Sequence, residues 1–247
     1  MEKLREALMT VHVFGDSHGN YLFSRTEQTI LHCTVGRTMH RVARDGIADM
    51  VQPVHLGVDD TVIFVFGEID VRCHLLRVAA SKGRSLQEEA NDLADRYITA
   101  LRNAFAGFPS RPRICIMGVV PPIDPLVQNP ILPHTGTLSE RLVAWFLLNE
   151  ALRAQAQKYK CVYVEIPARY RSLDGSLKRR YSDGIAHIAK DCSEAAVRAV
   201  EKALGMRLAF RRLPVRRNFM RTIMRQIAIL NDDYAVLWTL GESNVDR

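Results

Sequence analysis

The sequence predicts an α/β protein: a three-layer α/β/α sandwich in which helices cover both faces of a five-stranded parallel sheet. Two observations predict this fold. Five short apolar runs alternate along the chain with segments whose apolar residues recur at helical spacing. In addition, the run Thr61–Phe66 reads TVIFVF, a pattern typical of a central parallel strand that is buried on both faces.

The elements follow one another in a regular order. The expected strands are Met9–Phe14, Ile30–Val35, Thr61–Phe66, Arg113–Val120 and Cys161–Ile166. Glycines close the first three strands and prolines close the last two, because these residues interrupt regular structure. The expected helices are about Tyr21–Thr29, Arg37–Asp45, Leu86–Phe105, Leu138–Gln157 and Ile188–Leu204. Thr137 or Ser139, with Glu140 in the first turn, suits the start of the fourth helix, and Gly205 suits the end of the last.

The length of 247 residues allows one sizeable core without disulfides. We expect an α/β domain over residues 1–205 and a basic amphipathic extension over residues 206–247. No apolar run approaches the length of a membrane span, and the first residues have no apolar signal core. We therefore expect a cytoplasmic protein, either free or peripheral to the membrane, whose oligomeric state is left open.

The five cysteines are odd in number and have no CxxC spacing. This pattern predicts reduced thiols in the core, and it supports neither a zinc site nor any other cofactor.

The formal net charge of +7 is concentrated in residues 206–230, which hold seven arginines and no acid. In this segment Phe219, Ile223, Ile227 and Leu230 fall on one helical stripe. We expect the stripe to pack on the domain with the arginines in solvent. The alternative is that residues 206–230 bind an anionic membrane surface or a protein partner. Nucleic acid is not expected, because no recognised binding module accompanies the charge.

The last segment, Tyr234–Leu240, reads YAVLWTL. It is apolar enough to be a docked strand or a dimer contact.

Polar residues gather directly after the predicted strands and before the last helix. Because the carboxyl ends of parallel strands meet at one edge of a sheet, we expect these residues to line one crevice. They are Asp16, Ser17, His18, Gly36, Glu68, Asp70, Arg72, His74, Asp183 and His187.

Four short motifs resemble the sequence blocks of the SGNH/GDSL hydrolases, which have a flavodoxin-like sheet. They are Gly15-Asp16-Ser17 after the first strand, Gly36 after the second, Gly67-x-x-Asp70 after the third, and Asp183 with His187 before the last helix. The resemblance covers about residues 9–204.

The resemblance implies a serine esterase or deacylase that works through an acyl-serine intermediate. Ser17 would be the nucleophile, His187 its general base, and Asp183 the group that orients the imidazole. The backbone N–H groups of Ser17 and Gly36 would face the oxyanion. The charge-rich crevice favours a short acyl ester of a carbohydrate or another polar small molecule as substrate.

The chain departs from the family pattern at two places. The third block is usually Gly-x-Asn-Asp, but here it reads Gly67-Glu68-Ile69-Asp70, so the asparagine that donates to the oxyanion is missing. Arg72 or His74 is the candidate replacement. The family usually has Asp-x-x-His, whereas one extra residue separates Asp183 from His187, which requires a bulged turn.

The cluster Glu68, Asp70 and Arg72 has two interpretations. It is either an ion-pair network that pins the loop, or it holds Arg72 ready to grip a carboxylate or phosphate of the substrate.

Other functions remain open for the same residues. Asp16-Ser17-His18 also resembles the Asp-x-His start of calcineurin-like metallophosphoesterases, in which both side chains bind metal, but the later metal-binding motifs of that family are absent. An acyltransferase would keep Ser17 and His187, and a non-catalytic binding protein would keep only the crevice.

Overall fold

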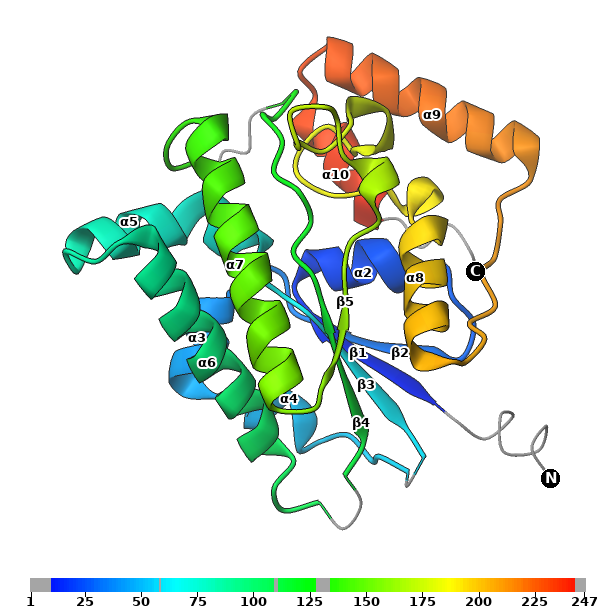
Figure 1. Ribbon diagram of the computed structural model, residues 1–247. Coiled ribbons are helices and arrows are strands. Elements are labelled where there is room, and N and C mark those ends of the chain that lie inside the picture. Colours follow the sequence, from blue (N-terminus) through cyan, green and yellow to red (C-terminus); the bar gives the residue numbers. More distant parts are fainter. Residues whose placement is uncertain (1–9, 58, 109–110, 128–133, 243–247) are drawn as a thin grey trace.

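A five-stranded sheet separates two layers of helices in the computed structural model, which describes residues 10–57, 59–108, 111–127 and 134–242 (Figure 1). Its strands are β1 (Val11–Gly15), β2 (Thr29–Cys33), β3 (Thr61–Val65), β4 (Arg113–Met117) and β5 (Val162–Val164). They lie in the order β2-β1-β3-β4-β5, and every neighbouring pair is parallel. The predicted fold class is therefore confirmed. The order reverses between β1 and β3, where ligands of such sheets bind.

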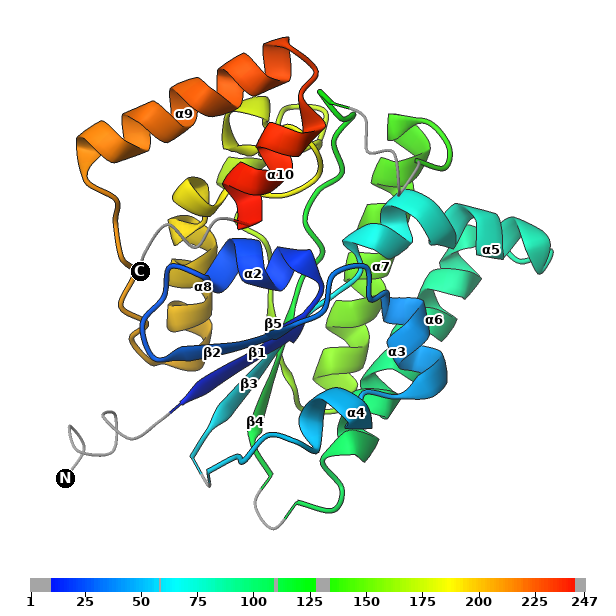
Figure 2. The same ribbon diagram turned by 180° about the vertical axis from the view of Figure 1, so that it is seen from behind.

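Helices cover both faces of the sheet (Figures 1 and 2). One face carries α3 (Met39–Asp45), α4 (Ala48–Val51), α5 (Leu75–Ser81), α6 (Leu86–Ala104) and α7 (Leu138–Lys158); the other carries α2 (Ser17–Phe23) and α8 (Glu194–Leu204). Alternate residues of β3 supply the two cores. Phe64 packs with α6 and α7, whereas Ile63 packs with α2 and α8. Burial on both faces explains why this strand is a continuous apolar run.

Helix ends follow the capping signals of the sequence. Thr137 accepts from the backbone N–H of Glu140, and the Glu140 carboxylate accepts from the backbone N–H of Thr137, which forms a capping box at the start of α7. Ser85 and Glu88 form the same box at the start of α6. Gly205 ends α8 in the left-handed conformation, with φ of 64°.

Three segments of the core differ from the prediction. The first helix spans Ser17–Phe23 rather than about Tyr21–Thr29, and Thr29 begins β2. The last core helix begins at Glu194 rather than near Ile188, because residues 182–193 form a turn and a short 3-10 helix at Lys190–Cys192. Residues 70–81 are helical rather than a loop: a π-helical turn over Asp70–His74 leads into α5. The sequence signal for this helix is a set of apolar residues four apart, namely Val71, Leu75 and Ala79. All three are buried.

Two helices follow the core, α9 (Val215–Leu230) and α10 (Tyr234–Glu242). The last segment is therefore a helix and not a strand. Its first turn is capped by Asp233, whose carboxylate accepts from the backbone N–H of Val236. Both helices lie beyond the carboxyl ends of the strands in the two opposite views (Figures 1 and 2). The division of the chain at residue 205 stays a prediction.

The expected orientation of α9 is wrong. Arg225 is buried and pairs with Asp191 at 2.8 Å, while Phe219 and Leu230 have 63% and 84% of their surfaces exposed. Arg221 and Arg225 face inward because the carbonyl oxygen of Leu240 and the carboxylate of Asp191 accept from them.

The five cysteines are free thiols. Within residues 10–242, setting aside the short gaps, no helix combines the length and the apolar character that crossing a bilayer would require.

Candidate active site

Ser17 lies at a sharp turn from β1 into α2. Gly15 ends the strand, and Asp16 caps the helix by accepting from the backbone N–H of His18 at 2.8 Å. A Cβ at position 15 would lie 2.7 Å from the carbonyl oxygen of Val65 in β3, so only glycine fits this close approach. The turn thus places the Ser17 side chain over the carboxyl end of β1, at the predicted edge.

The structure brings Ser17, His187 and Asp183 together in a hydrogen-bonded chain. The Ser17 Oγ lies 2.9 Å from the His187 Nε2, and the His187 Nδ1 lies 2.7 Å from the Asp183 Oδ2. All three side chains are buried, with Ser17 only 7% exposed. A hydroxyl, an imidazole and a carboxylate in this order can activate the hydroxyl as a nucleophile.

A bulged turn accommodates the extra residue between Asp183 and His187. The other carboxylate oxygen, Oδ1, accepts from the backbone N–H groups of Ile185, Ala186 and His187 at 2.9, 3.1 and 3.0 Å. Gly184 adopts a φ of 98°, which side chains with a Cβ rarely adopt. The chain therefore wraps around the carboxylate, and the longer spacing still delivers both side chains to one place.

Competing effects act on the pKa of Asp183. Burial by itself would raise it, but the charge and hydrogen bond of His187, together with the backbone N–H donors, lower the pKa to about 2. The carboxylate is therefore ionised at neutral pH and can stabilise an imidazolium at His187.

Two aromatic rings hold the His187 imidazole in place. Tyr21 stacks on it with ring centroids 3.9 Å apart and planes 14° apart, and the His18 ring lies 4.4 Å away. The sequence interpretation missed Tyr21. The position of Tyr21 could have revealed it, because Tyr21 follows Ser17 by four residues and so lies on the same face of α2.

His18 connects the nucleophile turn to an ion pair after β3. Its Nδ1 lies 3.1 Å from the Asp16 Oδ1, and its Nε2 lies 3.7 Å from Glu68. Glu68 in turn accepts from the Arg72 Nε and Nη2 at 2.9 and 3.0 Å. Burial opposes the charged form of His18, but Asp16 and Glu68 outweigh it and raise the pKa of His18. Burial likewise opposes a charged Glu68, yet Arg72 and His18 lower the pKa of its carboxyl.

These contacts favour the structural interpretation of the Glu68–Arg72 pair. Both side chains are buried, and the guanidinium faces Glu68 with two of its nitrogens. Such a bidentate pair is well suited to pin the start of the helix after β3.

Asp70 does not lie in the crevice, contrary to the prediction. Its carboxylate accepts from the backbone N–H groups of Met39 and His40 at 2.6 and 3.0 Å, and from the His40 ring at 2.6 Å. Asp70 therefore ties the start of α3 to the end of β3. The reason is that the π-helical turn directs this side chain toward the backbone N–H groups in the first turn of α3, which have no acceptor within that helix.

His74 and Gly36 lie together in an open groove of about 750 Å³. The His74 ring lies 3.0 Å from Arg77. Gly36 has a φ of 77° and open space where a Cβ would stand. The backbone N–H of Thr34 donates to the carbonyl of Gly15 at 2.9 Å, so the segment that leads to Gly36 runs beside the nucleophile turn.

Ile69 stands where the family resemblance places an oxyanion asparagine, and it is buried. Its side chain cannot donate a hydrogen bond. Among the residues that the structure describes, no group of three or more His, Cys, Asp or Glu side chains is arranged to bind a metal ion. Asp16 and His18, the ligands in the metallophosphoesterase interpretation, bond to each other instead.

Comparisons with known proteins find the same fold in solved structures. The chain is similar to a Streptococcus pneumonia protein described as a candidate platelet activating factor, with 16% identity and a TM-score of 0.55 over 82% of this chain and 90% of the other. It is also similar to a carbohydrate acetylesterase from Sinorhizobium meliloti, with 16% identity and a TM-score of 0.51 over 80% and 98% of the two chains. A GDSL-like lipase from Bacteroides thetaiotaomicron has 13% identity and a TM-score of 0.50 over 82% and 87%. No protein-family model and no curated protein matches the sequence.

Proposed function

We propose that the protein is a serine hydrolase of the SGNH/GDSL type, an esterase or deacylase that forms an acyl-serine intermediate on Ser17. One observation carries the proposal: Ser17, His187 and Asp183 form a hydrogen-bonded chain at the carboxyl edge of the sheet. The order of the sequence blocks and the fold shared with a carbohydrate acetylesterase and a GDSL-like lipase support it.

The reaction begins when the His187 Nε2 takes the proton of the Ser17 hydroxyl as its oxygen attacks the carbonyl carbon of the ester. Asp183 accepts from the Nδ1–H and stabilises the imidazolium. The tetrahedral intermediate then collapses, and His187 gives its proton to the departing alcohol. Water, activated by the same imidazole, releases the acid from the acyl-serine.

The weaker part of this site is the set of groups that would stabilise the oxyanion. The backbone N–H groups of Ser17 and Gly36 are the proposed donors. Ile69 stands where the family has a third donor, the asparagine side chain. Losing one such donor typically lowers the rate by about 10² to 10³. We therefore expect a slow hydrolase compared with members of the family that keep the asparagine.

The groove beside Gly36 supports a polar substrate. It is lined mainly by charged and polar side chains, among them His40, Arg41, His74 and Arg77. Such a lining suits the alcohol part of a carbohydrate ester better than a long acyl chain. We infer a short acyl ester of a carbohydrate or a similar polar molecule as the substrate class.

A fluorophosphonate probe tests the nucleophile directly. We expect the probe to label the protein and Ser17→Ala to abolish both labelling and hydrolysis of p-nitrophenyl acetate. The matched control is Ser193→Ala, which removes another buried serine hydroxyl and should leave labelling intact. Labelling that survives in Ser17→Ala, or a chelator-sensitive phosphatase activity without labelling, would overturn the proposal.

A further inference from the structure

Helix α9 is packed on the protein with its polar side inward. Arg225 forms a buried ion pair with Asp191 at 2.8 Å, and Arg221 donates to the carbonyl of Leu240 at 2.6 Å. Ala228 is buried in one cluster with the turn between Asp183 and His187, and Ile229 packs against the same cluster. These contacts, which run from Arg221 to Ile229, fix which side of α9 faces inward.

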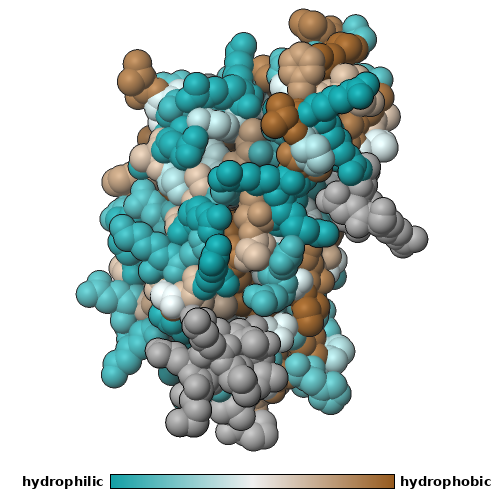
Figure 3. Space-filling view, turned by 90° about the vertical axis from the view of Figure 1, so that its right-hand side faces the viewer, coloured by the Kyte–Doolittle hydropathy of each residue, from teal (hydrophilic) through white to brown (hydrophobic). Residues whose placement is uncertain are grey.

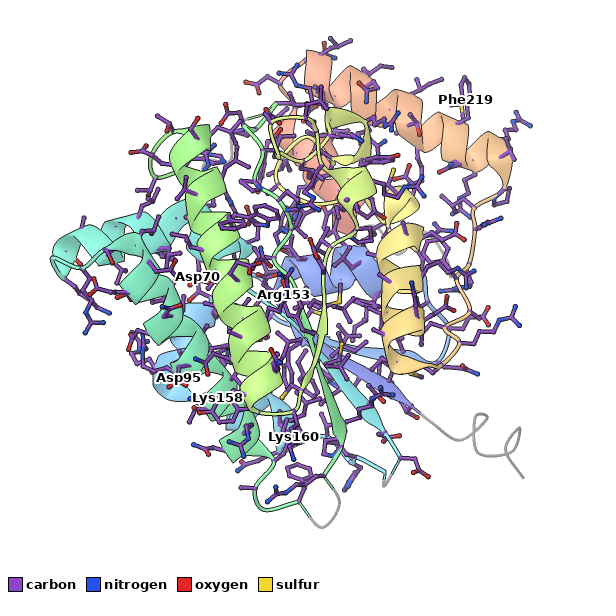
Figure 4. The ribbon with its side chains drawn as sticks, viewed as in Figure 1. Asp70, Asp95, Arg153, Lys158, Lys160 and Phe219 are labelled. Atoms are coloured by element: carbon purple, nitrogen blue, oxygen red, sulfur yellow. The ribbon has the colours of Figure 1, made fainter. Side chains whose placement is uncertain are left out.

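The opposite side of α9 is apolar and exposed. Its large side chains are Val215, Phe219, Met220, Met224, Ile227 and Leu230. In the side view, apolar residues gather at the top of the molecule, where α9 lies (Figure 3). Phe219 projects from the outer side of this helix (Figure 4). A 16-residue helix presents this face over about 24 Å, which is more apolar surface than scattered single residues explain.

The charge around this face is positive. Residues 206–230 contain seven arginines and no acid. Arg225 faces the domain and Arg212 pairs with Glu194, whereas Arg207, Arg211 and Arg216 are exposed. Arg216 stands next to Val215 at the start of the apolar face. An apolar helical face with nearby arginines is the pattern of a helix that lies in the plane of a membrane interface.

The charge also indicates which kind of partner binds this face of α9. Two copies of the chain that met through α9 would bring together two acid-free segments whose exposed arginines include Arg207, Arg211 and Arg216, and like charges repel. An anionic lipid surface attracts them instead, and each arginine near such a surface strengthens binding.

We propose that the exposed face of α9 docks on anionic lipid bilayers. Because α9 and α10 lie beyond the carboxyl ends of the strands (Figures 1 and 2), docking brings the edge of the sheet that carries Ser17 toward the membrane. The docking surface consists of α9 residues and does not depend on the chemistry at Ser17.

Co-sedimentation with vesicles tests the proposal on the full chain. We expect binding to vesicles of phosphatidylcholine mixed with phosphatidylglycerol, and much weaker binding to phosphatidylcholine alone. Phe219→Ser should weaken binding about tenfold, because a large apolar side chain is lost from the face that docks on the lipid. Arg216→Ser should weaken it about fivefold at low salt. Ser17→Ala should bind like the wild type, which separates docking from the proposed hydrolysis.

Matched controls exclude general effects of the substitutions. Phe146→Ser removes a phenylalanine of similar exposure from α7 (55% exposed), and Arg111→Ser removes an exposed arginine near the start of β4. Both should bind as tightly as the wild type, and unfolding temperatures of all variants check that they fold. Equal binding to both vesicle types, equal losses in Phe219→Ser and Phe146→Ser, or a dimer in solution that Phe219→Ser breaks without any vesicle binding, would each overturn the proposal.

Discussion

Replacing Asp183 by asparagine should impair catalysis by changing the tautomer of His187. Asp183 uses both carboxylate oxygens, Oδ1 for three backbone N–H groups and Oδ2 for the His187 Nδ1. An asparagine has one acceptor oxygen, which the three N–H groups should retain. Its amide then donates to the Nδ1, so the Nε2 carries the proton and cannot accept the one from Ser17. By analogy with serine proteases we expect kcat/KM to fall by about 10⁴.

The same substitution should change the pH dependence of stability. The pKa of Asp183 is lowered to about 2 from its ordinary value of 3.8, and this difference is worth about 2 kcal/mol of unfolding free energy. Because the folded-state pKa is the lower one, this stabilisation is complete above pH 3.8 and is lost as the pH falls toward 2. The asparagine side chain of the Asp183→Asn variant cannot ionise, so wild type and variant should differ by about 2 kcal/mol at neutral pH and converge in acid.

Two measurements check this reasoning. Hydrolysis of p-nitrophenyl acetate gives kcat/KM at neutral pH, and urea unfolding between pH 2 and 7 gives the stability gap. Asp232→Asn, at an exposed carboxylate after α9, is the control and should change neither. A kcat/KM within tenfold of the wild type, or a stability gap that stays constant down to pH 2, would refute the assigned role of Asp183.

Two further predictions concern the surroundings of the site. Glu68→Gln and Arg72→Met should each cost about 3–5 kcal/mol of unfolding free energy in urea titrations, because each breaks a buried ion pair, whereas the double variant should cost much less than their sum. A double variant that folds but loses all turnover would instead favour Arg72 as a substrate clamp. Gly184→Ala should lower the unfolding free energy by about 1–3 kcal/mol, because its Cβ would meet Ile229 at 2.8 Å in addition to the strained φ. Gly46 has a positive φ of 80° and open space where a Cβ would stand. Gly46→Ala therefore isolates the backbone part, and an equal loss in both variants would argue against the contact with α9.

Part of the candidate site was predictable because its signals are local. The alternation of apolar runs with helical periodicity indicated the parallel sheet, and a parallel sheet gathers the residues after its strands at one edge. The resemblance of the motifs to the sequence blocks of the SGNH/GDSL hydrolases then paired Ser17 with His187 across the chain. The turn around Asp183 was also foreseen in part, because Gly184 permits a backbone that other residues resist.

Other parts depended on contacts between distant segments, which a sequence pattern does not carry. Asp70 has the composition of a crevice residue, but the π-helical turn that follows β3 directs it to the amides of α3. Tyr21 gains its role only when the loop with His187 folds onto α2.

The chain by itself thus determined the sheet, the edge that holds the site, and the presence of an amphipathic basic helix. Only the tertiary structure decided which way that helix faces. Periodicity places Arg221 and Arg225 on the side of α9 opposite its apolar stripe, but it is the carbonyl of Leu240 and the carboxylate of Asp191 that accept from them and turn that side inward. The outward apolar face follows from partners more than ten residues away, and for that reason hydrophobic periodicity alone predicted the opposite orientation.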